Sequence, residues 1–295
     1  MPARNYRRAF PTSEKFEKFT RITANLINNL LHGLLSMANK RTSNIIFIHG
    51  VNSQSTGYSN ELYKSIIESY IEQLEESGVD KAESKIKAEM LVQKEILWAD
   101  VTIDLTNRYG FLQYDLNKKP GKWNFLLRNV DPLVMQILYY VRDKGRKRGP
   151  MTILKRVHES FKSACSNKPE SVFIIAHSLG SVVAYDYVCG FRKYRMNPKT
   201  NVMSFITLGS PIPLFTSAMG YVENRFKWPN NVKSWVNILD PDDGIARFCN
   251  PFFKNFKVRD VRVNTGFGPL GAHAGYWKSR ETARVIAEKI IQCTT

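Results

Sequence analysis

The sequence predicts an α/β protein with a mainly parallel sheet that carries helices on both faces. Short runs of β-branched and aromatic residues alternate with segments whose apolar residues recur every three or four positions. The stretch 171–185 combines both patterns, because a buried strand passes through a tight turn directly into an amphipathic helix. Since parallel strands need long crossover connections, helices between successive strands favour a parallel sheet covered on both faces.

The composition is that of a folded protein with a large excess of positive charge. Among 295 residues, 43% are apolar, which is close to the globular norm. Lysine and arginine number 43 against 26 acidic residues, so the net charge is +17. This charge predicts contact with a phospholipid surface or a nucleic acid, and an unspecialised basic surface stays equally open. No motif that reads RNA or DNA is present, which ranks nucleic acid low as a partner.

Cysteine usage and hydropathy predict a cytoplasmic protein that could associate peripherally with a membrane. No run approaches the ~18–20 uninterrupted apolar residues of a transmembrane helix. The four cysteines are well separated, and none belongs to a C-x-x-C pair or has a histidine at metal-ligand spacing. Free thiols in a reducing compartment follow, with a disulfide as the minor alternative. The sequence implies no metal and no cofactor.

Residues 1–43 are expected to form a basic arm and an amphipathic helix ahead of a single α/β domain over 44–295. The first 13 positions are arginine-rich and acid-free, and apolar residues recur every three or four positions from about 14 to 38. Such a helix could lie in a membrane interface through its basic face, or simply pack on the domain. A cleaved organelle-targeting segment also stays open.

A serine turn lies at residues 176–180, which read Ala-His-Ser-Leu-Gly. Small residues on either side of the serine let a strand turn sharply into a helix, because a large side chain at Ala176 or Gly180 would collide across the turn. Ser178 would then take a strained conformation at the top of the sheet, above a helix N-terminus. In this context the residues resemble the nucleophile elbow of the α/β-hydrolase superfamily, particularly its lipases and serine esterases.

An apolar strand over 44–52 ends in the turn His49-Gly50. In the hydrolases that the chain resembles, this turn supplies one backbone N–H of the oxyanion hole, where glycine lets the backbone approach the substrate. The resemblance implies the N–H of Val51 as that donor, paired with the N–H of Leu179. An ordinary turn at the end of a strand is the plainer interpretation.

The remaining elements follow from periodicity and turn residues. A helical insertion is expected between the His-Gly strand and the elbow strand. Expected helices cover 60–76, 80–94, 133–141, 152–166 and 279–291, and expected strands cover 94–100, 202–208, 234–240 and 258–264. Three further segments are expected to be a charged surface loop at 142–148, a small aromatic-rich lid near 213–232 and a glycine-rich loop at 266–275. The phrases Trp-Ala-Asp at 98–100 and Thr-Leu-Gly-Ser-Pro at 207–211 also resemble the hydrolases.

Elimination leaves one histidine as the base for Ser178. Serine needs such a base at neutral pH, and the base needs an orienting acid. The chain has five histidines. Two lie upstream of the sheet's centre, one falls in a predicted helix, and one flanks the serine with its side chain expected to point elsewhere: His32, His49, His158 and His177. His273 remains, in the loop after the last strand, where its imidazole could reach the serine.

Three aspartates after the strand over 234–240 compete for the role of the acid. Asp243 is preferred, because Asp243-Gly-Ile-Ala resembles the Asp-x-Val-Ala or Asp-x-Ile-Val ending common after this strand in the hydrolases. Asp240 ranks second and Asp242 third. A carboxylate here could instead cap a helix starting near Gly244, and a solvated acidic turn is the plainer alternative. With any of the three, the order Ser, Asp, His matches that of the fold.

The resemblance implies a serine hydrolase of the lipase or esterase type, which cleaves carboxylic esters of apolar acyl groups through an acyl-enzyme. Small-molecule or lipid esters are the expected substrates, and an anionic membrane surface is a second expected partner. The alternative, from another class, is a catalytically silent protein of the same fold that binds lipid or a partner through its charge. The fold itself does not choose among ester, thioester and amide, or between water and another acyl acceptor.

Overall fold

A computed structural model describes residues 42–51, 54–102, 136–142, 152–190, 194, 196–218, 228, 231–253 and 257–294. All of these lie in one compact unit, Thr42–Thr295. The expected arm and helix before residue 42, the loop at 143–148 and most of the expected lid lie outside the described residues. No helix in the described part of the chain is long and apolar enough to cross a membrane.

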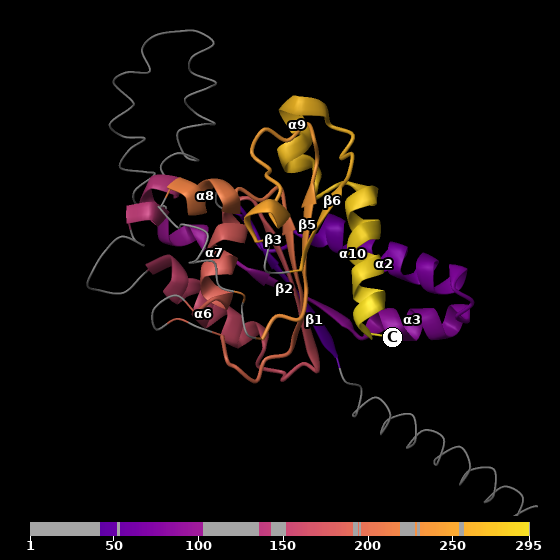
Figure 1. The fold of residues 1–295 in the computed structure, drawn as a ribbon. Helices are drawn as coiled ribbons and strands as arrows, with labels where there is room; N and C mark the ends of the chain where they lie inside the picture. The colour runs from indigo at the N-terminus through magenta and orange to yellow at the C-terminus, as the bar shows by residue number, and fades with distance from the viewer. Residues whose placement is uncertain are drawn as a thin grey trace, which may run out of the picture. The chain divides into compact units, whose positions relative to one another are not determined.

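Six parallel strands form one sheet in the order β2-β1-β3-β4-β5-β6 (Figure 1). Their bounds are Ser43–Ile48 for β1, Leu91–Ile96 for β2, Ser171–His177 for β3, Val202–Leu208 for β4, Trp235–Leu239 for β5 and Val258–Arg262 for β6. The first strand, β1, lies next to one edge of the sheet, where β2 follows it, and the chain then crosses over β1 and adds β3 to β6 in order toward the other edge. This order, with a serine turn directly after β3, is that of the α/β-hydrolase fold, and the predicted fold class is confirmed.

Helices cover both faces of the sheet (Figure 1). The helices are α2 Asn60–Glu76, α3 Lys81–Glu89, α6 Thr152–Ala164, α7 Leu179–Val188, α8 Ile212–Ala218, α9 Gly268–Gly275 and α10 Arg280–Thr294. Residues 136–142 are also helical, and two short 3₁₀ turns cover Ala99–Thr102 and Asn250–Phe252. Helices α6, α7 and α8 lie on one face, and α2, α3 and α10 lie on the other.

Two apolar cores result, one on each face, because successive side chains of a strand point in opposite directions. In β1, Ile46 and Ile48 join the core beneath α6 and α7, whereas Ile45 and Phe47 join the core beneath α2 and α10. All seven residues of β3 are buried, as expected for a central strand covered on both sides. The serine turn is therefore attached to a strand that is buried along its whole length.

The edge strand β2 begins three residues earlier than the predicted strand at 94–100. Its six residues pair one to one with the six residues of β1, so the length of β1 sets its bounds. The predicted helix at 80–94 is correspondingly shorter, and α3 ends at Glu89. Asp80 caps its start by accepting hydrogen bonds from the N–H groups of Ala82 and Glu83.

The predicted glycine-rich loop at 266–275 is wrong, because residues 268–275 form the helix α9. Gly266 and Gly268 do take positive φ values, of 81° and 61°, where the chain turns into the helix. The glycines inside α9 allow close packing instead of a turn. A Cβ at Gly275 would lie 2.6 Å from a ring carbon of Phe267, so this glycine lets the helix pack closely on that ring.

Candidate active site

Ser178 occupies a strained turn between β3 and α7. Its backbone has φ 53° and ψ −133°, a left-handed conformation that costs a non-glycine residue roughly 1–3 kcal/mol. The N–H of Ser178 donates to the carbonyl oxygen of Leu208 at 3.0 Å, which ties the turn to the end of the neighbouring strand β4. The serine is buried, with 2% of its surface exposed. Surrounding contacts therefore hold the hydroxyl in one orientation.

The two glycines of the predicted motifs let the serine turn pack against the His-Gly turn. A Cβ at Gly180 would lie 2.1 Å from the carbonyl oxygen of His49, and a Cβ at Gly50 would lie 2.7 Å from the Cβ of Ser178. Any side chain at either position would therefore push the two turns apart. Trp98 also holds the His-Gly turn in place, because its indole N–H donates to the carbonyl oxygen of His49 at 2.8 Å.

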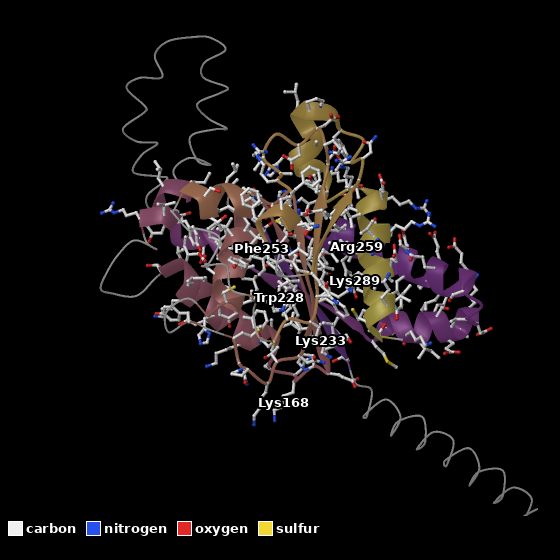
Figure 2. All side chains as sticks on the ribbon, viewed as in Figure 1. Lys168, Trp228, Lys233, Phe253, Arg259 and Lys289 are labelled. Atoms are coloured by element: carbon white, nitrogen blue, oxygen red, sulfur yellow. The ribbon has the colours of Figure 1, made fainter. Side chains whose placement is uncertain are left out.

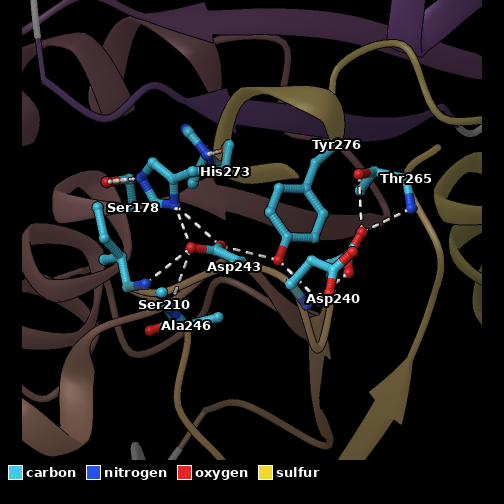
Figure 3. A network of polar contacts seen from close by, with 12 residues as sticks. Ser178, Ser210, Asp240, Asp243, Ala246, Thr265, His273 and Tyr276 are labelled. Carbon is cyan, nitrogen blue, oxygen red and sulfur yellow. Dashed lines mark hydrogen bonds and ion pairs between the residues drawn. The ribbon is translucent and has the colours of Figure 1, made fainter. Parts of the chain in front are cut away.

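The structure brings Ser178, Asp243 and His273 together, as Figure 3 shows. The Nε2 atom of His273 lies 2.8 Å from the hydroxyl oxygen of Ser178. Its Nδ1 atom lies 3.0 and 2.9 Å from the two carboxylate oxygens of Asp243. Because an ionised carboxylate only accepts hydrogen bonds, the proton belongs on Nδ1, and Nε2 is left to accept the serine O–H.

The carboxylate of Asp243 is held by three further groups. It accepts hydrogen bonds from the N–H groups of Ile245 at 2.8 Å and Ala246 at 3.3 Å, and from the hydroxyl of Tyr276 at 2.9 Å. Burial alone would raise the pKa of Asp243, but these hydrogen bonds and the neighbouring His273 hold it below its usual range. Asp243 therefore stays ionised. The two backbone bonds close a short turn, and no helix begins at Gly244.

Asp240, the second-ranked acid, is occupied elsewhere. Its carboxylate accepts hydrogen bonds from the N–H and the hydroxyl of Thr265, each at 2.7 Å, and from the N–H of Asp242 at 2.9 Å. Burial works against the charge, but these bonds lower the pKa of Asp240. Thr265 lies just before α9, so Asp240 anchors the segment that carries His273. Asp242 is exposed and has no described contact with the histidine.

Tyr276 is a residue of the site that sequence reasoning missed. Its hydroxyl accepts from the N–H of Asp240 at 2.8 Å and donates to Asp243 at 2.9 Å, so it links the two aspartates. It follows His273 by three positions, which places both on one side of the same helical turn. Gly209, with φ 55°, makes room for this group, because a Cβ there would lie 2.7 Å from the ring of Tyr276. A lone tyrosine carries no sequence signal for such a role.

The side chain of His177, expected to point away from the serine hydroxyl, contacts His273. Its Nε2 atom donates to the carbonyl oxygen of His273 at 2.7 Å, and the two imidazole rings lie 4.9 Å apart. The side chain does not contact the hydroxyl of Ser178 among the described residues. The ring instead holds the backbone of His273, the histidine whose Nε2 atom does contact that hydroxyl.

Two buried histidines should make the fold sensitive to mild acid. Burial lowers the pKa of His177 to about 3, aided by the nearby His273, and lowers that of His49 to about 4. The unfolded chain protonates both rings below pH ~6.5, whereas the folded chain keeps them neutral, so stability is complete above that pH and is lost below it. From pH 7 to 5 we expect the free energy of unfolding to fall by about 4 kcal/mol, about 2 from each histidine.

The variant His177→Gln tests this expectation, because an amide keeps a donor for His273 and does not titrate. Urea unfolding of the wild type and the variant at pH 7, 6 and 5 should show the variant losing about half as much stability. An equal loss in both proteins would contradict the assignment of this pH dependence to His177.

The two N–H groups predicted for an oxyanion hole belong to Leu179, the residue after the serine, and to Val51, the residue after Gly50. Leu179 is the first residue of α7, so its N–H is one of the helix donors without a partner inside the helix. Val51 follows Gly50, whose position against Ser178 is described above. No hydrogen bond joins either N–H to another residue in the described part of the chain. The positive end of the α7 dipole lies at the N–H of Leu179.

Comparisons with known proteins identify no family for this chain and one distantly similar structure. No protein-family model matches the chain, and no curated protein sequence matches it. Among solved structures, a dienelactone hydrolase from Anabaena variabilis is similar, with 12% identity and a TM-score of 0.41 over 86% of this chain and 88% of that one. This likeness is distant. The fold assignment rests instead on the strand order and on the strained serine turn after β3.

Proposed function

We propose that this chain is a serine hydrolase that cleaves carboxylic esters through an acyl-enzyme intermediate. One observation carries the proposal: Ser178 on its strained turn lies 2.8 Å from His273, which lies 2.9 Å from the buried, ionised Asp243. A structural cluster would not need a serine in a costly backbone conformation. Such strain, together with a hydrogen-bonded base and acid, is typical of an activated nucleophile.

In the proposed mechanism, His273 accepts the hydroxyl proton at Nε2 as the oxygen of Ser178 attacks the ester carbonyl. Asp243 stabilises the imidazolium through Nδ1–H, and the N–H groups of Val51 and Leu179 stabilise the oxyanion. The C–O bond to the alcohol breaks, and His273 returns the proton to the leaving alkoxide. A water molecule, deprotonated by His273, then attacks the acyl-enzyme. The bond between the acyl carbon and the Ser178 oxygen breaks, His273 returns the proton to that oxygen, and the carboxylic acid leaves.

We further propose an apolar acyl group as the part of the substrate that is recognised. Segments joined to the site expose large apolar side chains, namely Leu214 on α8, Phe267 and Leu270 on or beside α9, and Phe248 and Phe252 after the Asp243 turn. Apolar side chains left in water favour an apolar ligand or surface. The net charge of +17 supports an anionic membrane as the place where such esters are met. All four cysteines are free thiols, which supports a reducing, cytoplasmic location.

Activity-based labelling tests the proposal. The purified chain should hydrolyse p-nitrophenyl esters, with a preference that rises with acyl length, and should react with a fluorophosphonate. Peptide mass spectrometry should place the adduct on Ser178. Failure of both reactions, with and without anionic lipid vesicles, would overturn the proposal. If salt-sensitive vesicle binding persisted in that case, the catalytically silent binding protein would be the better description.

A further inference from the structure

A second concave site lies at the other end of the sheet from Ser178. This cavity of about 620 Å³, here named the basal groove, is enclosed by the end of α6, the turn before β3, the end of α7 and the turn before β4. Lys168 and Pro169 line it and precede β3, whereas Ser178 follows β3. Seven strand residues separate them, which is roughly 23 Å at ~3.3 Å per residue. In the view of Figures 1 and 2, Lys168 lies at the foot of the molecule and α9 at the top.

Three lysines line the groove, and no carboxylate is among its described lining residues. Lys162 comes from α6, Lys168 from the turn before β3 and Lys199 from the turn before β4. None of the three forms an ion pair with a described acidic residue, whereas lysines on other helices do, as in the pairs Lys64–Glu68 and Lys87–Glu83. Three like charges around one concavity repel each other, so an anion placed among them would be attracted by all three.

The wall between the lysines is apolar and aromatic. Phe161, Cys165 and Pro169 line it, and the ring of Phe161 lies 5.3 Å from that of Tyr187. Burial raises the pKa of the Cys165 thiol to about 11, so the thiol stays protonated and behaves as a small apolar group. His158 lies 3.2 Å from the hydroxyl of Tyr187, which leaves a polar pair at one side. The groove therefore offers positive charge at its rim and apolar contact at its wall.

We propose that the basal groove binds an amphipathic organic anion, in which a phosphate or carboxylate headgroup is attached to an apolar body. The headgroup contacts the ammonium groups of Lys162, Lys168 and Lys199, and the apolar body packs on Phe161 and Cys165. The volume lies within the ~300–1,000 Å³ of pockets that enclose small organic ligands. This site is independent of the proposed ester hydrolysis, because none of its residues takes part in that reaction.

Titration calorimetry with dodecyl phosphate and with dodecanoate, both below their micelle concentrations, tests the proposal and distinguishes the two headgroups. Dodecyl maltoside serves as the neutral probe and should bind at least about tenfold more weakly than the better anion, since three charge contacts are lost. Combining Lys162→Gln, Lys168→Gln and Lys199→Gln should weaken anion binding by a similar factor. The matched control combines Lys64→Gln, Lys87→Gln and Lys155→Gln, which removes the same charge from lysines paired with glutamates.

Alkylation of cysteines localises the ligand. The bound anion should slow the reaction of Cys165 with N-ethylmaleimide and leave Cys293, on α10 at the opposite face of the sheet, unchanged. Peptide mass spectrometry reads both sites in one sample. The proposal is overturned if neither anion binds, if the groove variant binds as well as the wild type, or if binding leaves Cys165 unprotected.

Discussion

Replacing Ser178 with alanine should lower kcat for ester hydrolysis by about 10⁶-fold, because the proposed nucleophile is lost and His273 then has nothing to deprotonate on the enzyme. The substitution should also abolish fluorophosphonate labelling. Folding should be retained, since an alanine side chain fits wherever the serine did. Single-turnover assays with a p-nitrophenyl ester measure the loss of activity, and thermal unfolding measures whether the fold is retained. A variant that folds and still turns over the ester within tenfold of the wild type would disprove the role of Ser178.

Ser204→Ala is the matched control. Ser204 is a buried serine on β4, and its hydroxyl has no hydrogen-bond partner in the described part of the chain. Its removal should leave kcat unchanged and alter the free energy of unfolding by less than about 1 kcal/mol. A second comparison, Ser178→Gly, should be more stable than Ser178→Ala by about 1 kcal/mol, because glycine adopts φ 53° without strain.

The parts of the fold and site that local patterns determine were predictable from the sequence. The elbow at 176–180 needs small residues at fixed positions, and the packing of Gly180 against His49 is the contact that this requirement anticipates. The strands were found because a buried parallel strand is a continuous apolar run. His273 could be selected by elimination and Asp243 by the resemblance of Asp243-Gly-Ile-Ala to the hydrolases, although their contact depends on the whole sheet.

The features that the sequence did not predict depend on contacts between segments that are distant in the chain. The glycines at 266–275 predict a loop, yet Gly271 and Gly275 lie inside the helix α9, where the side chain of Phe267 leaves no room for a Cβ. Tyr276 carries no local signal, because its role comes from reaching Asp240 and Asp243, which lie more than thirty positions earlier in the chain. The partner of the His177 side chain was not predictable for the same reason, since it is the backbone of a residue 96 positions away.

Replacing Asp243 with asparagine should lower kcat by about 10⁴-fold while leaving the fold intact. The amide can present its N–H₂ to His273, which favours the tautomer with the proton on Nε2. That proton would point at the hydroxyl of Ser178, and the ring could no longer accept the serine proton. The measurement is kcat against KM with p-nitrophenyl esters. We expect KM to change little, because Asp243 contacts His273 and not the substrate.

Asp240→Asn is the matched comparison, because it makes the same chemical change at the neighbouring aspartate. An amide oxygen can still accept from Thr265, but its N–H₂ group would face one of the donors that the carboxylate now accepts. We expect a loss of about 1–3 kcal/mol in the free energy of unfolding, and a fall in kcat of less than about tenfold. The two variants thus distinguish an aspartate that acts in the reaction, whose loss lowers kcat, from one that anchors the segment before α9, whose loss lowers the free energy of unfolding. If Asp240→Asn lost 10⁴-fold in kcat and Asp243→Asn did not, the acid would be Asp240, and the contact between Asp243 and His273 would serve only to hold α9.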